Sequence, residues 1–325
     1  MRPARLKTWV RIIGIAVALL AVGLCLRTLI DQWSAIGPAL RQTHAGWIAI
    51  AGVSSALSMV GLALLWWRCL RLYGTRTRLA DTTAWYFAGE LGKYLPGGVW
   101  SVVGRGELAQ RGGVGRGQAY STTLLSYASM CIAAALVCGA LAPVATRGSG
   151  LGWGWAVLAL IPLGCLAVHP AIVRPILSVA ARVTRGRVAL QVRPWGSMLG
   201  LVLWSVPTWI LVGAAASAVT AALGYDQQPA RVAFAAIAAW IVGFLVVPVP
   251  AGAGVRELVF VALCGLAAGP ATAVAALARL LLVAVDMVGG LAGLWWARSA
   301  RRSRDQNEPV DARVGGARTS RESSR

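Results

Sequence analysis

The sequence predicts an all-α, polytopic integral membrane protein with about eight transmembrane helices and one re-entrant or broken helical hairpin. Of the 325 residues, 58% are hydrophobic and only 13% are charged, a balance that is too apolar for a water-soluble domain of this length. Apolar stretches of about 20 residues, the length that crosses a bilayer core about 30 Å thick, recur along the chain. The basic residues gather between alternate stretches and at the two ends.

The first apolar run, 12–30, follows four basic residues and could be mistaken for a secretory signal. It is longer than the apolar region of a signal peptide and lacks a small-residue cleavage site. We therefore expect a retained first span.

Seven further runs are long enough to be considered as spans, although 255–268 is marginal. The eight predicted spans are 12–30, 46–67, 119–145, 151–168, 196–223, 232–248, 255–268 and 271–296.

Residues 82–104 are also apolar but are interrupted by Glu90, Lys93 and a Pro96-Gly97-Gly98 turn. Proline and glycine break a helix, so this stretch favours a hairpin that enters and leaves the membrane on one side. The alternative is an amphipathic segment that lies on the membrane surface.

The distribution of lysine and arginine predicts the orientation, because basic residues near span ends are retained in the cytoplasm. Of the 31 basic residues, four precede the first span, eight lie in 68–118, five in 169–195 and eight in the tail from Arg298. The loops predicted on the opposite side of the membrane contain only Arg41, Arg147 and Arg231. With eight crossings both ends are cytoplasmic, and this parity favours 255–268 as a true crossing.

We expect one membrane domain, 1–298, followed by a disordered basic cytoplasmic tail, 299–325, which has no apolar periodicity. The tail is either a topology signal or an attachment to anionic headgroups. Only two of the basic residues are lysines, which is typical of a GC-rich bacterial genome, and we therefore expect the protein in a bacterial cell membrane.

Several classes of function are disfavoured by the composition. The net charge of +20 follows the topology, so we expect no nucleic-acid partner. The two histidines stand apart and the six cysteines contain no C-x-x-C pair, so we expect no metal, no cofactor and no nucleophilic triad. An intramembrane enzyme is the less favoured alternative, because the carboxylates lack an evident nucleophile.

Charged residues inside apolar segments mark the candidate site, because a charge in the hydrocarbon core costs about 2.5–3.5 kcal/mol and therefore usually faces a partner or a cavity. Asp286 lies about 4 Å from the midpoint of its span at 1.5 Å per residue. Arg279 precedes it by two turns and shares its helix face. The pair lines a polar cavity or belongs to a structural ion network.

A second charged group lies in the sequence Pro248-Val-Pro-Ala-Gly-Ala-Gly-Val-Arg-Glu257. Pro250 ends one helix, while Gly252 and Gly254 precede the next, whose free N–H groups favour an anion. Arg256 adds a positive charge and Glu257 follows it. A lipid phosphate or carboxylate is the natural ligand class, although a simple turn between helices explains the prolines equally well.

The charged group nearest the N-terminus has a similar order of residues, with Lys93 and the Pro96-Gly97-Gly98 break followed by Arg105 and Glu107. Both places contain proline, small residues, then arginine and glutamate before leucine. This similarity indicates an internal repeat of the kind found in transporters.

At these two motifs, over roughly residues 10–298, the chain resembles the flippase-like membrane family typified by the transmembrane domain of lysylphosphatidylglycerol synthases. The matching marks are Lys93-Tyr-Leu-Pro-Gly-Gly leading to Arg105, and Pro250-Ala-Gly-Ala-Gly-Val-Arg-Glu257, where Ala251 replaces a glycine of the family pattern. The bifunctional members carry an aminoacyltransferase domain after the membrane part, and no segment of this sequence corresponds to it.

The resemblance implies a stand-alone protein that moves an anionic phospholipid or polyprenyl-linked lipid headgroup between leaflets. On this hypothesis Lys93, Arg105, Arg256 and Arg279 bind the headgroup. Four carboxylates complete the polar path by balancing the arginines, binding a cationic group or exchanging protons: Glu90, Glu107, Glu257 and Asp286.

The alternative hypothesis is a non-transporting membrane partner that binds lipid for, or scaffolds, a cell-envelope glycosyltransferase or another lipid-modifying enzyme. Membrane lipids are the expected partners under both hypotheses.

Overall fold

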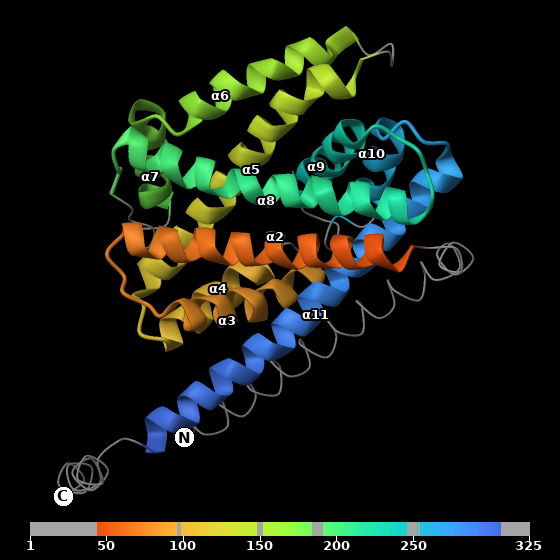
Figure 1. Cartoon of the computed structure of the whole chain (residues 1–325). Helices are drawn as coiled ribbons and strands as arrows, with labels where there is room; N and C mark the ends of the chain where they lie inside the picture. Colours follow the sequence, from red (N-terminus) through yellow and green to blue (C-terminus); the bar gives the residue numbers. More distant parts are fainter. Residues whose placement is uncertain are drawn as a thin grey trace, which may run out of the picture.

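The computed structural model describes residues 44–95, 99–147, 152–183, 191–245, 252 and 254–306. The predicted span 12–30 lies outside these ranges. All regular elements within them are helices, labelled as in Figure 1. In chain order they are α2 (Ala45–Leu72), α3 (Leu79–Glu90), η1 (Leu91–Tyr94), α4 (Trp100–Arg111), α5 (Arg116–Ala145), η2 (Gly152–Ala159), α6 (Leu160–Ala167), α7 (Pro170–Val183), α8 (Trp195–Ala222), α9 (Pro229–Leu245), α10 (Val255–Leu263) and α11 (Ala268–Gln306).

Four of the described helices are long and apolar enough to cross a membrane: α2, α5, α8 and the Ala268–Ser299 part of α11. The 28 residues of α2 extend about 42 Å at 1.5 Å per residue. A fifth span is possible by length if 154–167 and the first part of α7 are counted together, although they are bent by 68°. The all-helical membrane class is confirmed, whereas the count of about eight spans is not.

The predicted crossing at 255–268 requires correction. Helix α10 has nine residues and extends about 13 Å, less than half of the hydrocarbon thickness of about 30 Å. Helix α9 has 17 residues and packs against α10. A Cβ atom placed on Gly252 would lie 2.8 Å from the carbonyl oxygen of Gly243, so the chain comes back beside the end of α9.

Helices α3 and α4 form the first short-helix hairpin, as the sequence predicted for 82–104, and pack against each other. The alternative of a surface-lying segment is wrong for α3, because Trp85, Tyr86 and Phe87 are buried. Trp100, at the start of α4, is 44% exposed. The turn 96–98 lies outside the described residues.

Helices α9 and α10 form the second short-helix hairpin. The two hairpins belong to two similar units, α2–α5 and α8–α11. Each unit consists of a long helix, two short helices and a second long helix. Helix α5 packs on α9 and, in the corresponding contact, α11 packs on α3. The internal repeat predicted from the two proline-glycine motifs is therefore present in the arrangement of the helices.

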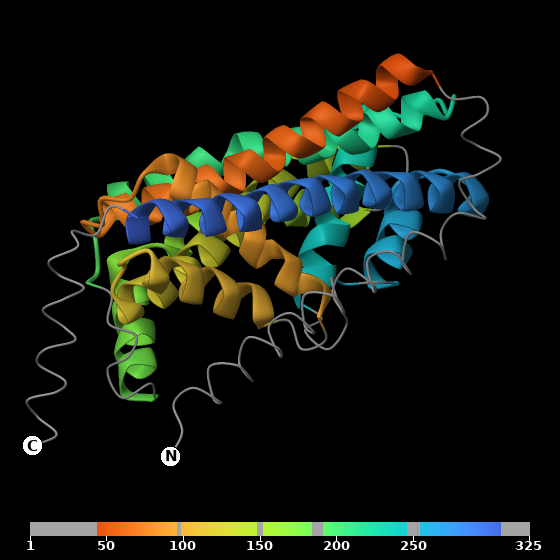
Figure 2. The same cartoon turned by 90° about the horizontal axis from the view of Figure 1, so that it is seen from below.

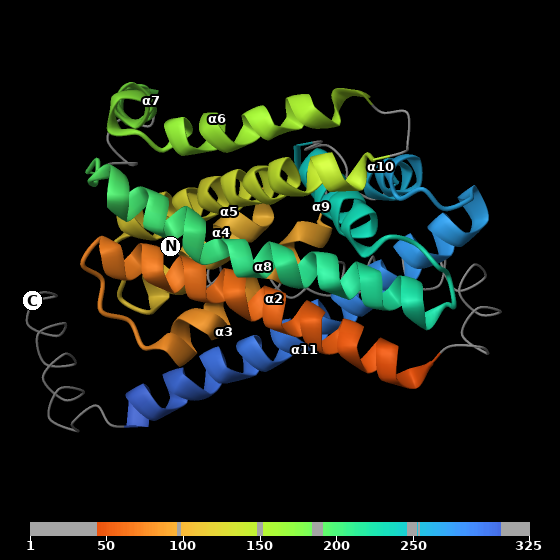
Figure 3. The same ribbon diagram turned by 45° about the horizontal axis from the view of Figure 1, so that its top comes forward.

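The two units run in opposite directions. At one end of the α2–α8 pair, the backbone N–H of His44 donates to the carbonyl of Ala222 at 3.3 Å. At the other end, the hydroxyl of Tyr73 donates to the carbonyl of Gln191 at 2.9 Å. Helices α2 and α8 thus lie antiparallel and side by side, as Figures 1 and 3 show. The repeat is inverted.

The turns that follow α2 and α8 have the same hydrogen bond. The N–H of Thr75 donates to the carbonyl of Leu70 at 3.0 Å, and the N–H of Tyr225 donates to that of Thr220 at 3.1 Å. The residue before each donor is a glycine with positive φ, 85° and 73°. This geometry ends a helix with a left-handed residue, which glycine adopts without a steric penalty.

Two peripheral parts of the fold differ from the prediction. The predicted span 151–168 begins with a 3-10 helix, η2, before it continues as α6. Helix α11 continues to Gln306, so residues 299–306 of the predicted disordered tail are helical. The remainder, 307–325, lies outside the described residues.

Candidate functional site

A cavity of about 410 Å³ lies between the two repeats. Both hairpins and the long helices α2, α5, α8 and α11 contribute to its wall. Its charged lining residues are Glu90, Lys93, Arg105, Arg256, Glu257, Arg279 and Asp286. Seven of the eight predicted charged residues are thereby brought to one place, although they are distributed over five helical elements.

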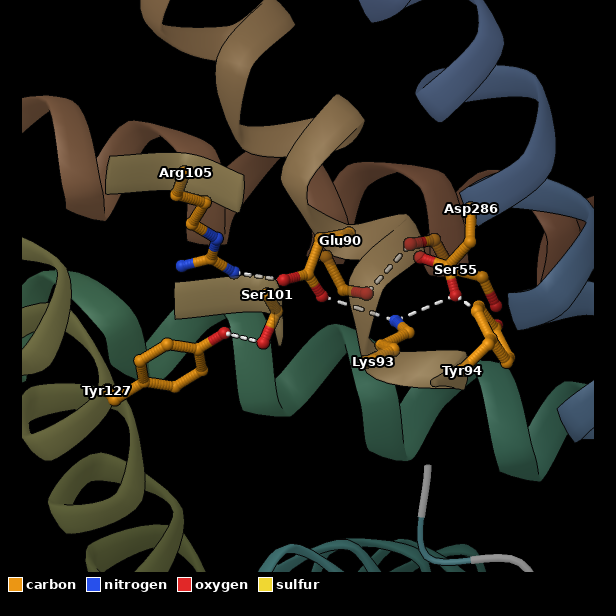
Figure 4. A network of polar contacts seen from close by, with 9 residues as sticks. Ser55, Glu90, Lys93, Tyr94, Ser101, Arg105, Tyr127 and Asp286 are labelled. Atoms are coloured by element: carbon orange, nitrogen blue, oxygen red, sulfur yellow. Dashed lines mark hydrogen bonds and ion pairs between the residues drawn. The ribbon is translucent and has the colours of Figure 1, made fainter. Parts of the chain in front are cut away.

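Four of these residues form a chain of alternating charge across the cavity wall (Figure 4). The Arg105 guanidinium donates to Glu90 Oε1, and Lys93 Nζ donates to Glu90 Oε2 at 3.2 Å. Lys93 also pairs with Asp286 Oδ2 at 2.7 Å. The chain connects α4, α3, η1 and α11, so it joins the first hairpin to a helix of the other repeat.

Three of these four charged residues are buried: Glu90 is 6% exposed, Arg105 1% and Asp286 0%. Burial of a charge is costly unless a counter-charge and hydrogen bonds replace the lost water. Tyr94 supplies one such bond, because its hydroxyl donates to Asp286 Oδ2 at 2.6 Å. The wall is therefore held in a specific arrangement by mutual neutralisation.

Local sequence explains how Arg105 reaches Glu90. A Cβ atom on Gly89 would lie 2.5 Å from Cγ of Arg105 and 2.8 Å from its backbone nitrogen, so only glycine permits this approach. The guanidinium lies 3.9 Å from the ring centre of Tyr86 and 4.7 Å from that of Tyr127. Favourable cation–π contacts therefore supplement the ion pair.

The second hairpin contributes a separate ion pair, in which the guanidinium of Arg279 on α11 donates to Glu257 on α10. Arg279 and Asp286, which the sequence places on one helix face, both line the cavity. Arg279 pairs with Glu257, whereas Asp286 pairs with Lys93. The interpretation of a structural ion network and that of a polar cavity both apply to this face.

Arg256 is different, because it forms no ion pair with any residue that the structure describes. Its Nε atom is buried without a hydrogen-bond acceptor. The nearest ring is that of Trp240, 5.5 Å from the guanidinium carbon. The cation thus lines the cavity beside an aromatic side chain and lacks a carboxylate partner within the described part of the chain.

The internal repeat explains the missing partner. Arg256 crosses Gly243 in the second hairpin as Arg105 crosses Gly89 in the first. In the first hairpin the residue after the glycine is Glu90, whereas in the second it is Phe244. An aromatic residue therefore stands where the first repeat has the carboxylate that neutralises its arginine.

The remaining predicted residues are placed as follows. Glu107 lies on the surface and accepts from Arg111 at 3.1 Å, so its assignment to the polar path is corrected: it follows Arg105 by two residues, about half a turn, and therefore lies on the opposite face of α4. Gly252 lines the cavity, and Gly254 precedes α10 with φ 80°. The other predicted break residues, Pro96, Gly97, Gly98 and Pro250, lie outside the described residues.

Sequence reasoning missed the uncharged part of the wall. Tyr127 lines the cavity, donates to the hydroxyl of Ser101 at 2.9 Å and stacks on Phe244 with ring centres 5.6 Å apart. Phe244 in turn stacks on Trp240 at 5.1 Å. A usable signal was the presence of hydroxyl groups inside otherwise apolar helices, but such groups also occur at ordinary helix contacts.

The fold and the site define a polytopic helical membrane protein with two inverted repeats around an ion-lined cavity. The chain belongs to the family described as the lysylphosphatidylglycerol synthase TM region, whose model matches residues 11–290. The suspected resemblance is thereby confirmed, and the protein is a membrane protein of a lipid-related family. A comparison with curated proteins finds no significant match.

Proposed function

We propose that this protein is a flippase-like lipid translocase that binds the phosphate of an anionic lipid headgroup in the cavity between its repeats. The observation that carries the proposal is Arg256, a cation of the cavity wall with a buried Nε atom that has no acceptor among the described residues. A phosphate oxygen is a suitable acceptor, because arginine presents a planar set of donors that matches phosphate geometry.

The surroundings of Arg256 support the same ligand class. It is the second residue of α10, and the N-terminal end of a helix favours negative charge. Lys93, 27% exposed at its side chain, lines the same cavity and supplies a second cation near the ligand. Arg105 and Arg279 orient the wall through Glu90 and Glu257 and are less available to a ligand.

Inverted repeats support transport. In transporters with such repeats, the substrate site lies near the bilayer midplane between the repeats, where helices are interrupted. This chain has two interrupted hairpins, and each packs against a long helix of the opposite repeat. Movement of one repeat against the other would expose the cavity to the two leaflets in turn. We expect a gradient or a partner protein to supply any energy, and no catalytic step.

The experiment that tests the proposal is transport of tail-labelled fluorescent phosphatidylglycerol in proteoliposomes, read as the fraction that becomes accessible to a reductant outside. We expect Arg256→Ala to lower the rate at least tenfold and Asp286→Ala to lower it as well. Glu107→Gln is the matched control, because Glu107 pairs on the surface.

Unchanged transport in both cavity variants would overturn the site. If the purified protein retains phospholipid, as measured by native mass spectrometry, but transports none until a lipid-modifying enzyme is added, the alternative of a non-transporting lipid-binding partner replaces the proposal.

A further inference from the structure

We infer that the cavity selects a lipid whose headgroup carries one net negative charge through a single phosphodiester, and that it discriminates against zwitterionic and diphosphate-linked lipids. The inference rests on the proposed function and specifies its substrate class. It is carried by the balance of charges in the cavity wall.

The described wall contains four cations and three carboxylates. Glu90 pairs with Arg105 and Lys93, and Lys93 also pairs with Asp286. These four residues together are neutral. Arg279 and Glu257 form a second neutral unit. Arg256 remains, so the described wall carries one excess positive charge.

The sequences of the two helix breaks add no charge to this balance. Residues 96–98 are Pro-Gly-Gly, and residues 246–251 and 253 are valine, proline and alanine. None of these side chains ionises. The excess of one positive charge is therefore a property of the described wall.

The excess charge determines the preferred ligand, because an unpaired charge is costly in a cavity that is lined mainly by apolar side chains. A phosphodiester monoanion neutralises Arg256 and leaves the cavity neutral. A zwitterionic headgroup brings no net charge and leaves the excess in place. A diphosphate brings at least two negative charges and leaves a carboxylate or phosphate oxygen without a counter-charge.

Two chemically different lipids satisfy this requirement: a glycerophospholipid such as phosphatidylglycerol, and a polyprenyl lipid joined to a sugar through one phosphate. Both headgroups carry one negative charge, so the charge of the cavity wall does not distinguish between them. The polyprenyl lipid joined to a sugar through a diphosphate is excluded.

The test compares initial transport rates in proteoliposomes for four fluorescent lipids: phosphatidylglycerol, phosphatidylcholine, a polyprenyl phosphate sugar and a polyprenyl diphosphate sugar. We expect at least one of the two monoanions to be transported at least tenfold faster than phosphatidylcholine and than the diphosphate. The arm that is fast identifies the source of the phosphodiester.

Variants that change the balance provide the decisive comparison. Glu257→Gln leaves Arg279 unpaired and raises the excess to two, so the diphosphate should overtake the monoanions. Arg256→Gln removes the excess, so phosphatidylcholine should approach the rate of phosphatidylglycerol. The double variant Glu257→Gln/Arg279→Gln restores an excess of one and should restore the original order even if Glu257→Gln alone folds poorly.

The proposed function and the selection by headgroup charge fail under different outcomes. If the wild-type protein transports none of the four lipids, the proposed function and the inference both fail. If it transports lipid without regard to headgroup charge, or if the double variant does not keep the wild-type order, only the charge-matched selection is overturned.

Discussion

Glu90 is the residue on which the first half of the cavity wall depends. It accepts from Arg105 with one carboxylate oxygen and from Lys93 with the other. Both oxygens are therefore occupied, and the residue is 6% exposed. Removal of its charge leaves the guanidinium of Arg105 buried without a counter-ion.

We expect Glu90→Gln to destabilise the folded protein by about 3–5 kcal/mol, the cost of removing one partner of a buried ion pair. Thermal unfolding of the purified protein in detergent measures this loss. Glu107→Gln is the control, because its pair with Arg111 is about half exposed at both side chains and exposed pairs contribute about 0–1 kcal/mol. Equal melting temperatures of the two variants would contradict the assigned role of Glu90.

At the scale of the elements, the contact between α3 and α4 depends on Gly89. The backbone of Arg105 lies so close that a Cβ atom on Gly89 would be 2.8 Å from the Arg105 nitrogen. A backbone atom cannot rotate away as the end of a side chain can. Any larger residue must therefore separate the two helices of the hairpin.

Gly89→Ala is expected to lower the melting temperature and to weaken lipid transport, because it displaces Arg105 from Glu90. Gly52→Ala, in the interior of α2, is the matched control: a Cβ atom there meets nothing within 4 Å, and alanine favours a helix over glycine by about 1 kcal/mol. The prediction fails if both variants melt together.

Helix α7 is the most peripheral element, and its apolar face is exposed. Ile172, Ile176 and Val179 are 42%, 60% and 56% exposed, and their spacing places them on one side of the helix. The exposed residues Arg174 and Ser178 lie on the other side. Figures 2 and 3 show α7 nearly perpendicular to the long helices, where it projects from one end of the bundle.

This geometry predicts that α7 lies in the plane of the membrane surface, with its apolar side toward the acyl chains. Spin labels at Ile176→Cys and Ser178→Cys, in a variant without the native cysteines and in phosphatidylglycerol vesicles, measure the depth. We expect oxygen to relax the label at 176 more strongly and a water-soluble nickel complex to relax that at 178. Equal access of nickel to both positions would show that α7 lies in water.

At the scale of the whole molecule, the inverted repeat bears on whether the number of membrane crossings is even, which decides whether the two ends of the chain lie on the same side. The loss of 255–268 as a crossing would, by itself, move the C-terminal tail to the outside. Because α9 packs against α10 as α3 packs against α4, both helices of the second pair belong to one hairpin. If two predicted crossings are lost together, the number of crossings stays even, and we still expect both ends on the same side.

We accordingly expect both termini in the cytoplasm of the cell that contains the protein. Single cysteines at Arg76, Gln227 and Ser303 test this with a membrane-impermeant maleimide applied to intact cells. Gln227→Cys should be labelled, whereas Arg76→Cys and Ser303→Cys should require permeabilisation. Labelling of Ser303→Cys from outside would overturn the orientation and the parity argument together.

The sequence by itself determined the membrane class, the long helices and the seven charged residues of the described cavity wall. These features are local: an apolar run specifies a helix that can cross a bilayer, and a charge within it must find a partner or a cavity. The family followed from the same motifs.

Only the tertiary structure decided which charges pair, because Asp286 and Lys93 lie almost 200 positions apart in sequence and their contact depends on how α11 packs on α3. It also decided that 255–268 turns back and that Glu107 faces outward, since a short helix and a helix face acquire their surroundings from neighbouring helices. The tertiary structure likewise decided that Arg256 has no carboxylate partner within the described part of the chain. This became evident once the repeats brought Gly89 and Gly243 into corresponding places and left Phe244 where the other hairpin has Glu90.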